Sequence, residues 1–261
     1  MTATATRLWA LDAPRFTVDS SLLLVGTLGP IEIRISAYLI QHPKGLVLFD
    51  TQCMPKAIDE GPQAAYGGLA EVINMVATPE MRLDRQVEAL GFDITDVTHV
   101  VASHLHFDHA GGLHLFPHAR FYAGQGEMRH AYWPEPAGAA FFVLEDILPT
   151  RGFDWTEIPN SVDHDLFGDG SVTLMSTPGH TPGELSALVR LPNRNIVLTG
   201  DTAHLAGGVE GLVPMPFSYD TSQAVLSLRK LRLVAEENDA FVWVCHDPTH
   251  WAEMQAPGSY D

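Results

Sequence analysis

The chain has 261 residues, of which 46% are hydrophobic and 18% charged, and its formal net charge is −17. This length accommodates one large domain or two small ones with a substantial hydrophobic core. The negative charge repels phosphate backbones and anionic lipid surfaces, so the composition argues against nucleic-acid and membrane partners. A small neutral or apolar substrate suits this charge better.

The location of the protein follows from what the sequence lacks. No segment approaches the roughly 20 apolar residues of a membrane span, and residues 1–16 show no basic-then-apolar signal peptide. The two cysteines, Cys53 and Cys245, are expected to be buried thiols rather than a disulfide. Adjacent residues on a strand face opposite sides, so Cys245 is expected in the core although it precedes His246. We expect a cytoplasmic protein, and either a monomer or a homodimer.

Short strands and helical segments alternate in the first half of the chain, according to its apolar patterns and turn residues. The patterns predict strands at residues 21–27, 31–40, 46–50, 98–103 and 120–123. They predict an irregular helical section at 55–81, a short helix at 83–90 that ends at Gly91, and a helical segment at 124–132.

The second half of the chain repeats this alternation. Strands are predicted at 171–176, 185–191, 195–199 and 241–245, with a helix at 222–237 that Asp220, Thr221 or Ser222 could cap. Strand runs with helices between them, in two similar halves, predict an α+β fold: an αβ/βα sandwich of two packed mixed β-sheets with helices on the outer faces. No linker separates the halves, so residues 1–261 are predicted to form a single domain.

Four metal-binding side chains lie within the six residues His104 to His109, directly after an apolar run. In an extended segment His104 and His106 face the same way, whereas Asp108 and His109 lie beyond a turn, so we expect two metal ions. Three later residues, each near the end of a predicted strand, complete the set. One ion is assigned to His104, His106 and His180, the other to Asp108, His109 and His246, and Asp201 is expected to bridge both.

The donor types limit the metal and its role. Nitrogen and oxygen ligands suit two divalent ions, most simply zinc, although iron, cobalt or manganese fit as well. Structural zinc sites are rich in thiolate, so this set favours a catalytic centre. Packing alone is a poor explanation for these side chains, because burying unpaired polar groups costs several kcal/mol. The isolated histidines are interpreted as core or loop residues, namely His99, His114, His118 and His130.

A dinuclear metal centre indicates hydrolysis. Two ions that share a hydroxide supply a nucleophile near neutral pH, because metal binding lowers the pKa of water to about 7. Asp108, beside the expected hydroxide, is the best candidate to carry a proton to the leaving group. Asp50 follows the apolar run Leu-Val-Leu-Phe and could orient a metal ligand or cap a turn.

The motifs resemble those of the metallo-β-lactamase fold superfamily, whose hallmark is His-x-His-x-Asp-His. Within that superfamily the chain looks most like the quorum-quenching N-acyl homoserine lactonases, on the segments at 104–112, 177–183 and 216–220. The resemblance implies a hydrolase that opens a lactone ring by attack of a metal-bridging hydroxide. Two positions differ from the pattern: His204 stands where those lactonases carry a Tyr, and Glu184 where they often carry a His.

The substrate pocket is expected to come from the irregular segments. In the lactonases the Tyr hydroxyl helps to hold the lactone carbonyl, and the imidazole N–H of His204 could donate the same kind of hydrogen bond. Apolar and aromatic side chains suited to an acyl chain occur in loop-like regions. The candidates are Met54, Tyr66, Met75, Trp133, Phe141, Phe142, Phe217 and Tyr219.

Other functions remain open from the sequence. The same centre could hydrolyse another lactone, an aryl ester, a phosphotriester or a thioester, or the chain could be a catalytically silent metal-binding protein. True β-lactamases lack the bridging aspartate, and glyoxalase II-type thioesterases add a helical extension where only 15 residues follow His246 in this chain of 261. Because every expected ligand is present, hydrolysis of a lactone is the preferred prediction.

Overall fold

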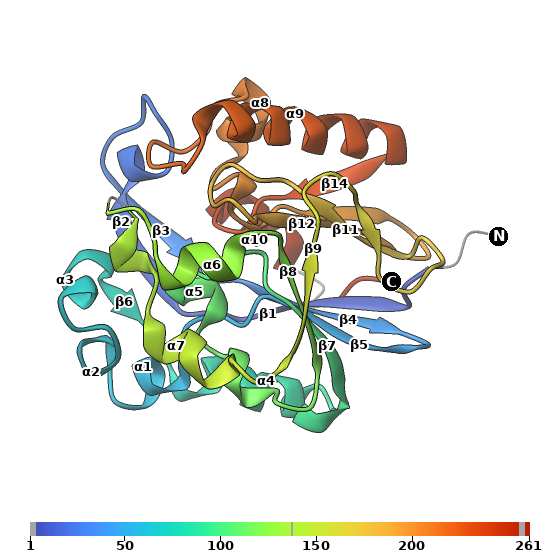
Figure 1. Cartoon of the computed structure of the whole chain (residues 1–261), viewed down its shortest axis with the longest axis horizontal. Coiled ribbons are helices and arrows are strands. Elements are labelled where there is room, and N and C mark those ends of the chain that lie inside the picture. Colours follow the sequence, from blue (N-terminus) through green and yellow to red (C-terminus); the bar gives the residue numbers. More distant parts are fainter. Residues whose placement is uncertain (1–3, 137, 256–258) are drawn as a thin grey trace.

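Two β-sheets pack face to face in the computed structural model, which describes residues 4–136, 138–255 and 259–261. Helices cover the outer side of each sheet (Figure 1). The predicted α+β sandwich is therefore confirmed, with a third, small sheet added beside it.

The first sheet has six strands in the order β1-β4-β5-β7-β8-β9. It is mixed, because β1, β4 and β5 pair antiparallel whereas β5, β7, β8 and β9 pair parallel. Its strands are β1 (Arg7–Leu11), β4 (Ala37–His42), β5 (Gly45–Phe49), β7 (Val97–Val101), β8 (Arg120–Gly124) and β9 (Asp154–Ile158).

The second sheet has five strands in the order β10-β11-β12-β13-β14, and its β13–β14 pair is parallel. Its strands are β10 (His164–Asp165), β11 (Val172–Ser176), β12 (Leu185–Arg190), β13 (Asn195–Leu198) and β14 (Ala240–Trp243). The small third sheet has the order β3-β2-β6, from β2 (Arg15–Asp19), β3 (Pro30–Arg34) and β6 (Met75–Val76).

Alternating side chains build the core between the two large sheets. On β4, Tyr38 and Ile40 point into the cluster that Leu174 and Trp243 enter from the second sheet. Leu39, between them in sequence, points to the outer face, because successive residues of a strand face opposite sides. Both faces of this sheet are thus buried.

Helices cover the outer faces. α9 (Thr221–Asn238) packs Leu231 and Ala235 on the second sheet. Of the three cap candidates, Asp220 is the one observed, and its carboxylate accepts two backbone N–H groups. The other α-helices are α1 (Pro55–Asp59), α2 (Pro62–Tyr66), α3 (Ala70–Ile73), α4 (Leu83–Ala89), α5 (Phe107–Ala110), α6 (Glu127–Tyr132), α7 (Leu144–Ile147), α8 (Ala206–Gly211) and α10 (Pro248–Gln255). None of the helices in the described ranges is long and apolar enough to cross a membrane.

One predicted strand is wrong, and another is divided in two. Residues 21–27 contain no strand, because the Asp19 carboxylate accepts the N–H of Ser21 and starts the 3-10 helix Ser20–Leu22. The strand lies earlier, at β2. The predicted strand 31–40 is two strands, β3 and β4, in different sheets. Its apolar pattern continues through Ile35, whose N–H pairs with Pro14 instead of a strand partner, so the pattern does not reveal the change of sheet.

Candidate metal centre

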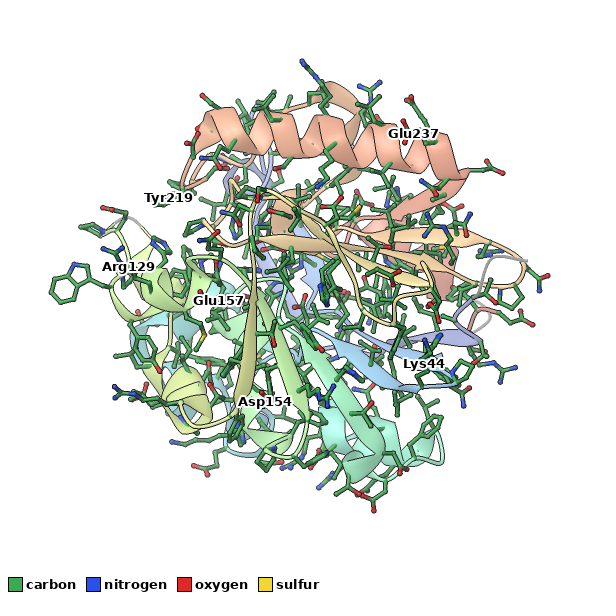
Figure 2. All side chains as sticks on the ribbon, turned by 45° about the vertical axis from the view of Figure 1, so that its right-hand side comes forward. Lys44, Arg129, Asp154, Glu157, Tyr219 and Glu237 are labelled. Carbon is green, nitrogen blue, oxygen red and sulfur yellow. The ribbon has the colours of Figure 1, made fainter. Side chains whose placement is uncertain are left out.

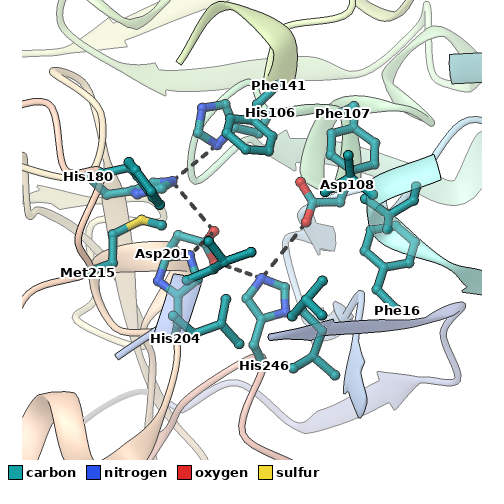
Figure 3. A pocket seen from close by; sticks show the side chains of 17 residues that line it. Phe16, His106, Phe107, Asp108, Phe141, His180, Asp201, His204, Met215 and His246 are labelled. Atoms are coloured by element: carbon teal, nitrogen blue, oxygen red, sulfur yellow. Dashed lines mark hydrogen bonds and ion pairs between the residues drawn. The ribbon is translucent and has the colours of Figure 1, made fainter. Parts of the chain in front are cut away.

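Seven ligand-type side chains gather at one edge of the sandwich, beyond the ends of four strands. Figure 3 shows the five of them that line the adjoining cavity. The loop after β7 and the short helix α5 supply the histidine motif at 104–109, and the loops after β11, β13 and β14 supply one side chain each. The structure places these predicted residues close together. They are His104, His106, Asp108, His109, His180, Asp201 and His246.

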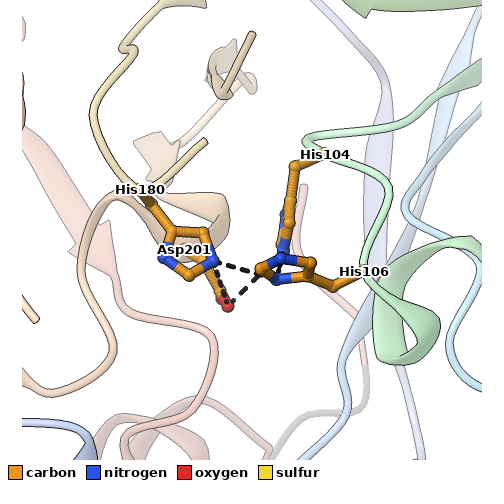
Figure 4. A group of neighbouring side chains, drawn as sticks. All are labelled: His104, His106, His180 and Asp201. Atoms are coloured by element: carbon orange, nitrogen blue, oxygen red, sulfur yellow. Dashed lines mark hydrogen bonds and ion pairs between the residues drawn. The ribbon is translucent and has the colours of Figure 1, made fainter. Parts of the chain in front are cut away.

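The first group joins His104, His106, His180 and Asp201, all buried (Figure 4). Nδ1 of His106 lies 2.9 Å from Nε2 of His104 and 3.1 Å from Nε2 of His180. Oδ2 of Asp201 lies 3.7 Å and 3.5 Å from the same two Nε2 atoms. A tetrahedral zinc with bonds of about 2.1 Å separates its ligand atoms by about 3.4 Å, so these four donors fit such an ion.

The second group joins Asp108, His109 and His246 around the other oxygen of Asp201. Oδ1 of Asp201 lies 3.3 Å from Nε2 of His109 and 3.1 Å from Nε2 of His246. Oδ2 of Asp108 lies 3.9 Å from both nitrogens. One carboxylate therefore presents an oxygen to each group, which is the arrangement that a bridging ligand requires.

The protonation of the first group suits metal binding. Burial lowers the pKa of His106 to about 3 and holds the pKa of His104 and His180 well below the usual histidine range. The three imidazoles are therefore neutral near pH 7 and keep a lone pair for an ion.

The shared carboxylate of Asp201 has several imidazoles as neighbours. Burial raises the pKa of Asp201, but the neighbouring His204 and His109 outweigh burial and hold the pKa well below the usual aspartate range. Burial also raises the pKa of Asp108. The two carboxylates thus differ: Asp201 stays ionised, whereas Asp108 holds a proton more readily.

Asp50 orients the second group. Its Oδ2 lies 2.9 Å from Nδ1 of His109, and its Oδ1 accepts the N–H of Ser103 at 2.7 Å. The sequence leaves two roles open for Asp50, orienting a metal ligand or capping a turn. The structure shows the contact with a metal-ligand candidate, His109. On His246, Nδ1 lies 2.7 Å from the carbonyl oxygen of Arg34. These contacts fix the imidazole tautomers that present Nε2 to the group.

The family follows from a comparison with known proteins. The Metallo-beta-lactamase superfamily model matches residues 31–246 of the chain. The chain belongs to the metallo-beta-lactamase superfamily. Its matched range covers both ligand groups, and the chain is a metal-dependent hydrolase of that superfamily.

Relatives within the superfamily cover nearly the whole chain. The N-acyl homoserine lactonase AttM of Agrobacterium fabrum is 36% identical over 234 residues, 88% of each chain. The N-acyl homoserine lactonase of Bacillus cereus is 28% identical over 94% of each chain. A solved N-acyl homoserine lactone hydrolase with N-hexanoyl-L-homoserine bound at its catalytic metal centre superimposes with a TM-score of 0.83, at 25% identity over 97% of both chains.

Cys245 is a buried residue that also contacts the candidate centre. It is buried, as expected, but its Sγ lies 3.2 Å from Oδ1 of Asp201, the oxygen that His246 also contacts. The strict alternation of a strand does not apply here, because β14 ends at Trp243 and both residues lie in the following loop. In this member of the superfamily the thiol donates to the shared carboxylate.

His204 lies at the centre as well. Its Nε2 is 3.0 Å from Oδ2 of Asp201, and the side chain lines the adjoining cavity. Asp201, His204 and His246 also present one donor atom each within 4.8 Å of one another. The side chain can therefore either face a substrate or bind an ion itself.

An apolar cavity of about 120 Å³ opens onto the centre between the two ligand groups. Phe141 and Phe217 line it, as predicted for the pocket. Most of its wall was not predicted, because it comes from the small third sheet, α3 and the loop before α9. These additional residues include Phe16, Val18, Leu22, Leu23, Ile33, Val72, Ile73 and Met215.

A second cavity of about 170 Å³ adjoins His106 and His180 and is more polar. Phe142 and Tyr219 line it, and so does His130, which the sequence analysis had placed in the core or a loop. It continues into an open groove that contains Trp133, whose side chain is 88% exposed. Figure 2 places Arg129 and Tyr219 of this groove on the same side of the molecule.

Three predicted pocket residues lie elsewhere. Met54, Tyr66 and Met75 belong to the hydrophobic cluster behind the apolar cavity and line none of the three cavities above. The Tyr66 hydroxyl accepts the N–H of Met54 at 2.8 Å, and its ring packs edge-on against Phe107 at 4.8 Å. The loop-like sequence around Tyr66 forms short helices that bury Tyr66, whereas Met75 lies on β6 and is half-buried.

Proposed function

We propose that this protein opens the ring of N-acyl homoserine lactones with two divalent metal ions, most simply zinc. The observation that carries the proposal is the position of Asp201, which offers one oxygen to each ligand group at the floor of an apolar cavity. The 36% identity to the N-acyl homoserine lactonase AttM supports the choice of substrate.

Each ion would have its own ligands. His104, His106 and His180 would hold one, and Asp108, His109 and His246 the other, with Asp201 on both. Zinc is supported by the donor distances and by the mixture of nitrogen and oxygen donors. When bound, two such ions supply a nucleophile from water near neutral pH and polarise an ester carbonyl.

The residues around the ions complete the reaction. The acyl chain would lie along the apolar cavity, which places the lactone ester between the two groups. His204, through its ring N–H, would donate a hydrogen bond to the carbonyl oxygen as negative charge develops there. Asp108, which lines the same cavity, would pass a proton to the ring oxygen when the C–O bond breaks. The product is the open N-acyl homoserine.

The partner, the cellular location and the domain organisation of the enzyme belong to the same proposal. The protein has a net charge of −17, so its partner would be a neutral lactone rather than a nucleic acid or an anionic membrane. Two buried free cysteines, Cys53 and Cys245, suit a cytoplasmic location. We further propose that residues 1–261 act as one domain.

Proton release by the zinc-loaded protein tests the function. Butanoyl and decanoyl homoserine lactones are compared with plain γ-lactones and an aryl ester, and protein stripped with a chelator serves as the control. The expected result is ring opening of the homoserine lactones well above both other rates, lost after stripping. If the protein binds two ions but leaves these lactones intact, the substrate assignment is wrong, and thioesters and phosphotriesters are tested next.

A further inference from the structure

Glu184 is a fully buried acid beside the candidate metal centre. It directly precedes β12, and its side chain is 0% exposed. A buried carboxylate is costly unless its oxygens have partners, so the contacts of this side chain indicate its role.

The two oxygens of Glu184 face two different ligand candidates. Oε1 accepts the backbone N–H of Asp201 at 2.8 Å. Oε2 lies 3.4 Å from Nδ1 of His104 and has no hydrogen-bond partner in the part of the chain that the structure describes. One side chain thus touches the shared carboxylate residue and the first histidine of the motif.

The backbone is shaped to admit this carboxylate. Gly200, which precedes Asp201, has a left-handed φ of 54°, and a Cβ built on it would lie 2.5 Å from Oε1 of Glu184. Only glycine leaves room for the approach. The loop that carries Asp201 therefore closes directly onto Glu184.

The partners of the two ligand groups differ. In the second group, His109 and His246 contact Asp50 and a backbone carbonyl through Nδ1. In the first group, Nδ1 of His104 has the hydroxyl of Ser103 at 3.0 Å and, as its nearest carboxylate, Glu184. A carboxylate that faces the N–H of a ligand histidine fixes the tautomer and makes the other ring nitrogen a stronger donor.

We propose that Glu184 is a positioning residue that couples His104 to Asp201 and strengthens the binding of the ion held by His104, His106 and His180. The inference rests on the proposed two-ion function, but it concerns metal affinity and not the choice of substrate. Glu184 touches no substrate and acts only through these two ligands. A purely structural role would instead affect the metal-free fold.

Glu184→Gln tests the coupling in the zinc-loaded protein. The amide oxygen can still accept the N–H of Asp201, but an NH₂ group then faces Nδ1 of His104. Titration with a chromophoric chelator is expected to remove one of the two ions about 10- to 100-fold more readily than from the wild type, while the other ion keeps its affinity. In the cobalt-substituted protein, the visible bands of one ion only are expected to change.

Glu127→Gln is the matched control. Glu127 is also 0% exposed, but it accepts the backbone N–H groups of Leu105 and Gly183 at 2.9 and 3.0 Å. Gln at this position leaves one of the two N–H groups without an acceptor but changes no contact with a ligand side chain, so it is expected to loosen the first ion much less than Glu184→Gln does. Equal loosening in both variants would mean that any buried carboxylate near the centre has the same effect, and the specific role of Glu184 would be overturned.

Glu184→Asp separates charge from size. The aspartate keeps a carboxylate but is shorter, and this variant is expected to hold the first ion more tightly than Glu184→Gln. An affinity for the first ion no higher than that of Glu184→Gln would contradict the proposal. Unchanged affinity in Glu184→Gln, together with a lower Tm of the stripped protein, would assign a structural role instead. Because the readout is metal affinity, failure to open homoserine lactones would refute the proposed substrate and leave this inference standing.

Discussion

Nε2 of His204 lies 3.0 Å from Oδ2 of Asp201, the oxygen that faces the first ligand group. The two residues are three positions apart, and the turn between them brings the imidazole over the shared carboxylate. Its ring centre is 5.0 Å from that of His180 and 5.4 Å from that of His246. The imidazole is thus placed between the groups, at the wall of the apolar cavity.

His204→Ala is expected to lower kcat on homoserine lactones by about 100-fold, the typical cost of one lost donor to a developing oxyanion. Metal content, measured by elemental analysis, should stay at two ions per chain. His204→Tyr restores a donor and should recover much of the rate. Loss of one ion in the alanine variant would make His204 a metal ligand, and unchanged kinetics would make it a bystander.

Asp201→Ala should abolish activity and metal binding together, because the carboxylate serves both ligand groups. His106→Ala should cost the first ion and the activity in the same way. His118→Ala, remote from the centre and bonded to the carbonyl of Val97, is the control and should keep both ions. Full activity of either ligand variant would refute the ligand assignment.

The metal-ligand candidates could be predicted because their signal is local. Four donor side chains in six residues have no packing explanation, and the ends of neighbouring strands meet at one edge of a sheet. The role of Glu184 could not be predicted, since its contact with His104 joins residues 80 positions apart. The contact of Cys245 with Asp201 was not expected, because strand alternation was applied beyond the end of β14.

The cavity wall illustrates a different limit. Phe16 and Ile33 pair across β2 and β3, and apolar residues on paired strands look the same whether they face a core or a cavity. Conversely, Tyr66 sits in a Gly-rich segment typical of a loop, yet its hydroxyl and ring are both used inside the protein. Only the folded structure distinguishes residues that line the cavity from residues that belong to the core.

Phe217→Ala should weaken the use of long acyl chains. The side chain borders the apolar cavity and the second cavity and is 54% exposed, so its removal should cost little stability. Loss of its apolar contact, about 1 kcal/mol, corresponds to a roughly fivefold fall in kcat/KM for decanoyl homoserine lactone. The butanoyl substrate should change less.

Leu226→Ala provides the matched control for this change, because Leu226 is 60% exposed on α9 and lines none of the three cavities. Its kinetics should equal those of the wild type on both substrates. If Phe217→Ala slows the butanoyl and decanoyl substrates equally, the acyl chain does not reach Phe217.

Asp146, on α7, should make stability depend on pH. It is 1% exposed, and neither carboxylate oxygen has a hydrogen-bond partner among the residues described. Burial, and then the nearby Glu145 and Asp108, raise the pKa of Asp146 to about 8. Between its usual value of 3.8 and about 8, the unfolded chain has lost this proton while the folded protein keeps it. The free energy of unfolding therefore falls as pH rises through that window, by at most about 1.4 kcal/mol per pH unit from this group.

Asp146→Asn removes the ionisable group and keeps its shape. The variant should gain stability over the wild type progressively between pH 5 and pH 8, and the difference should stop growing above about pH 8 because both states of the wild type are then ionised. Thermal unfolding of the metal-loaded proteins in buffers across this range measures the difference. A gap between the two Tm curves that stays constant with pH would show that Asp146 does not keep its proton in the folded protein.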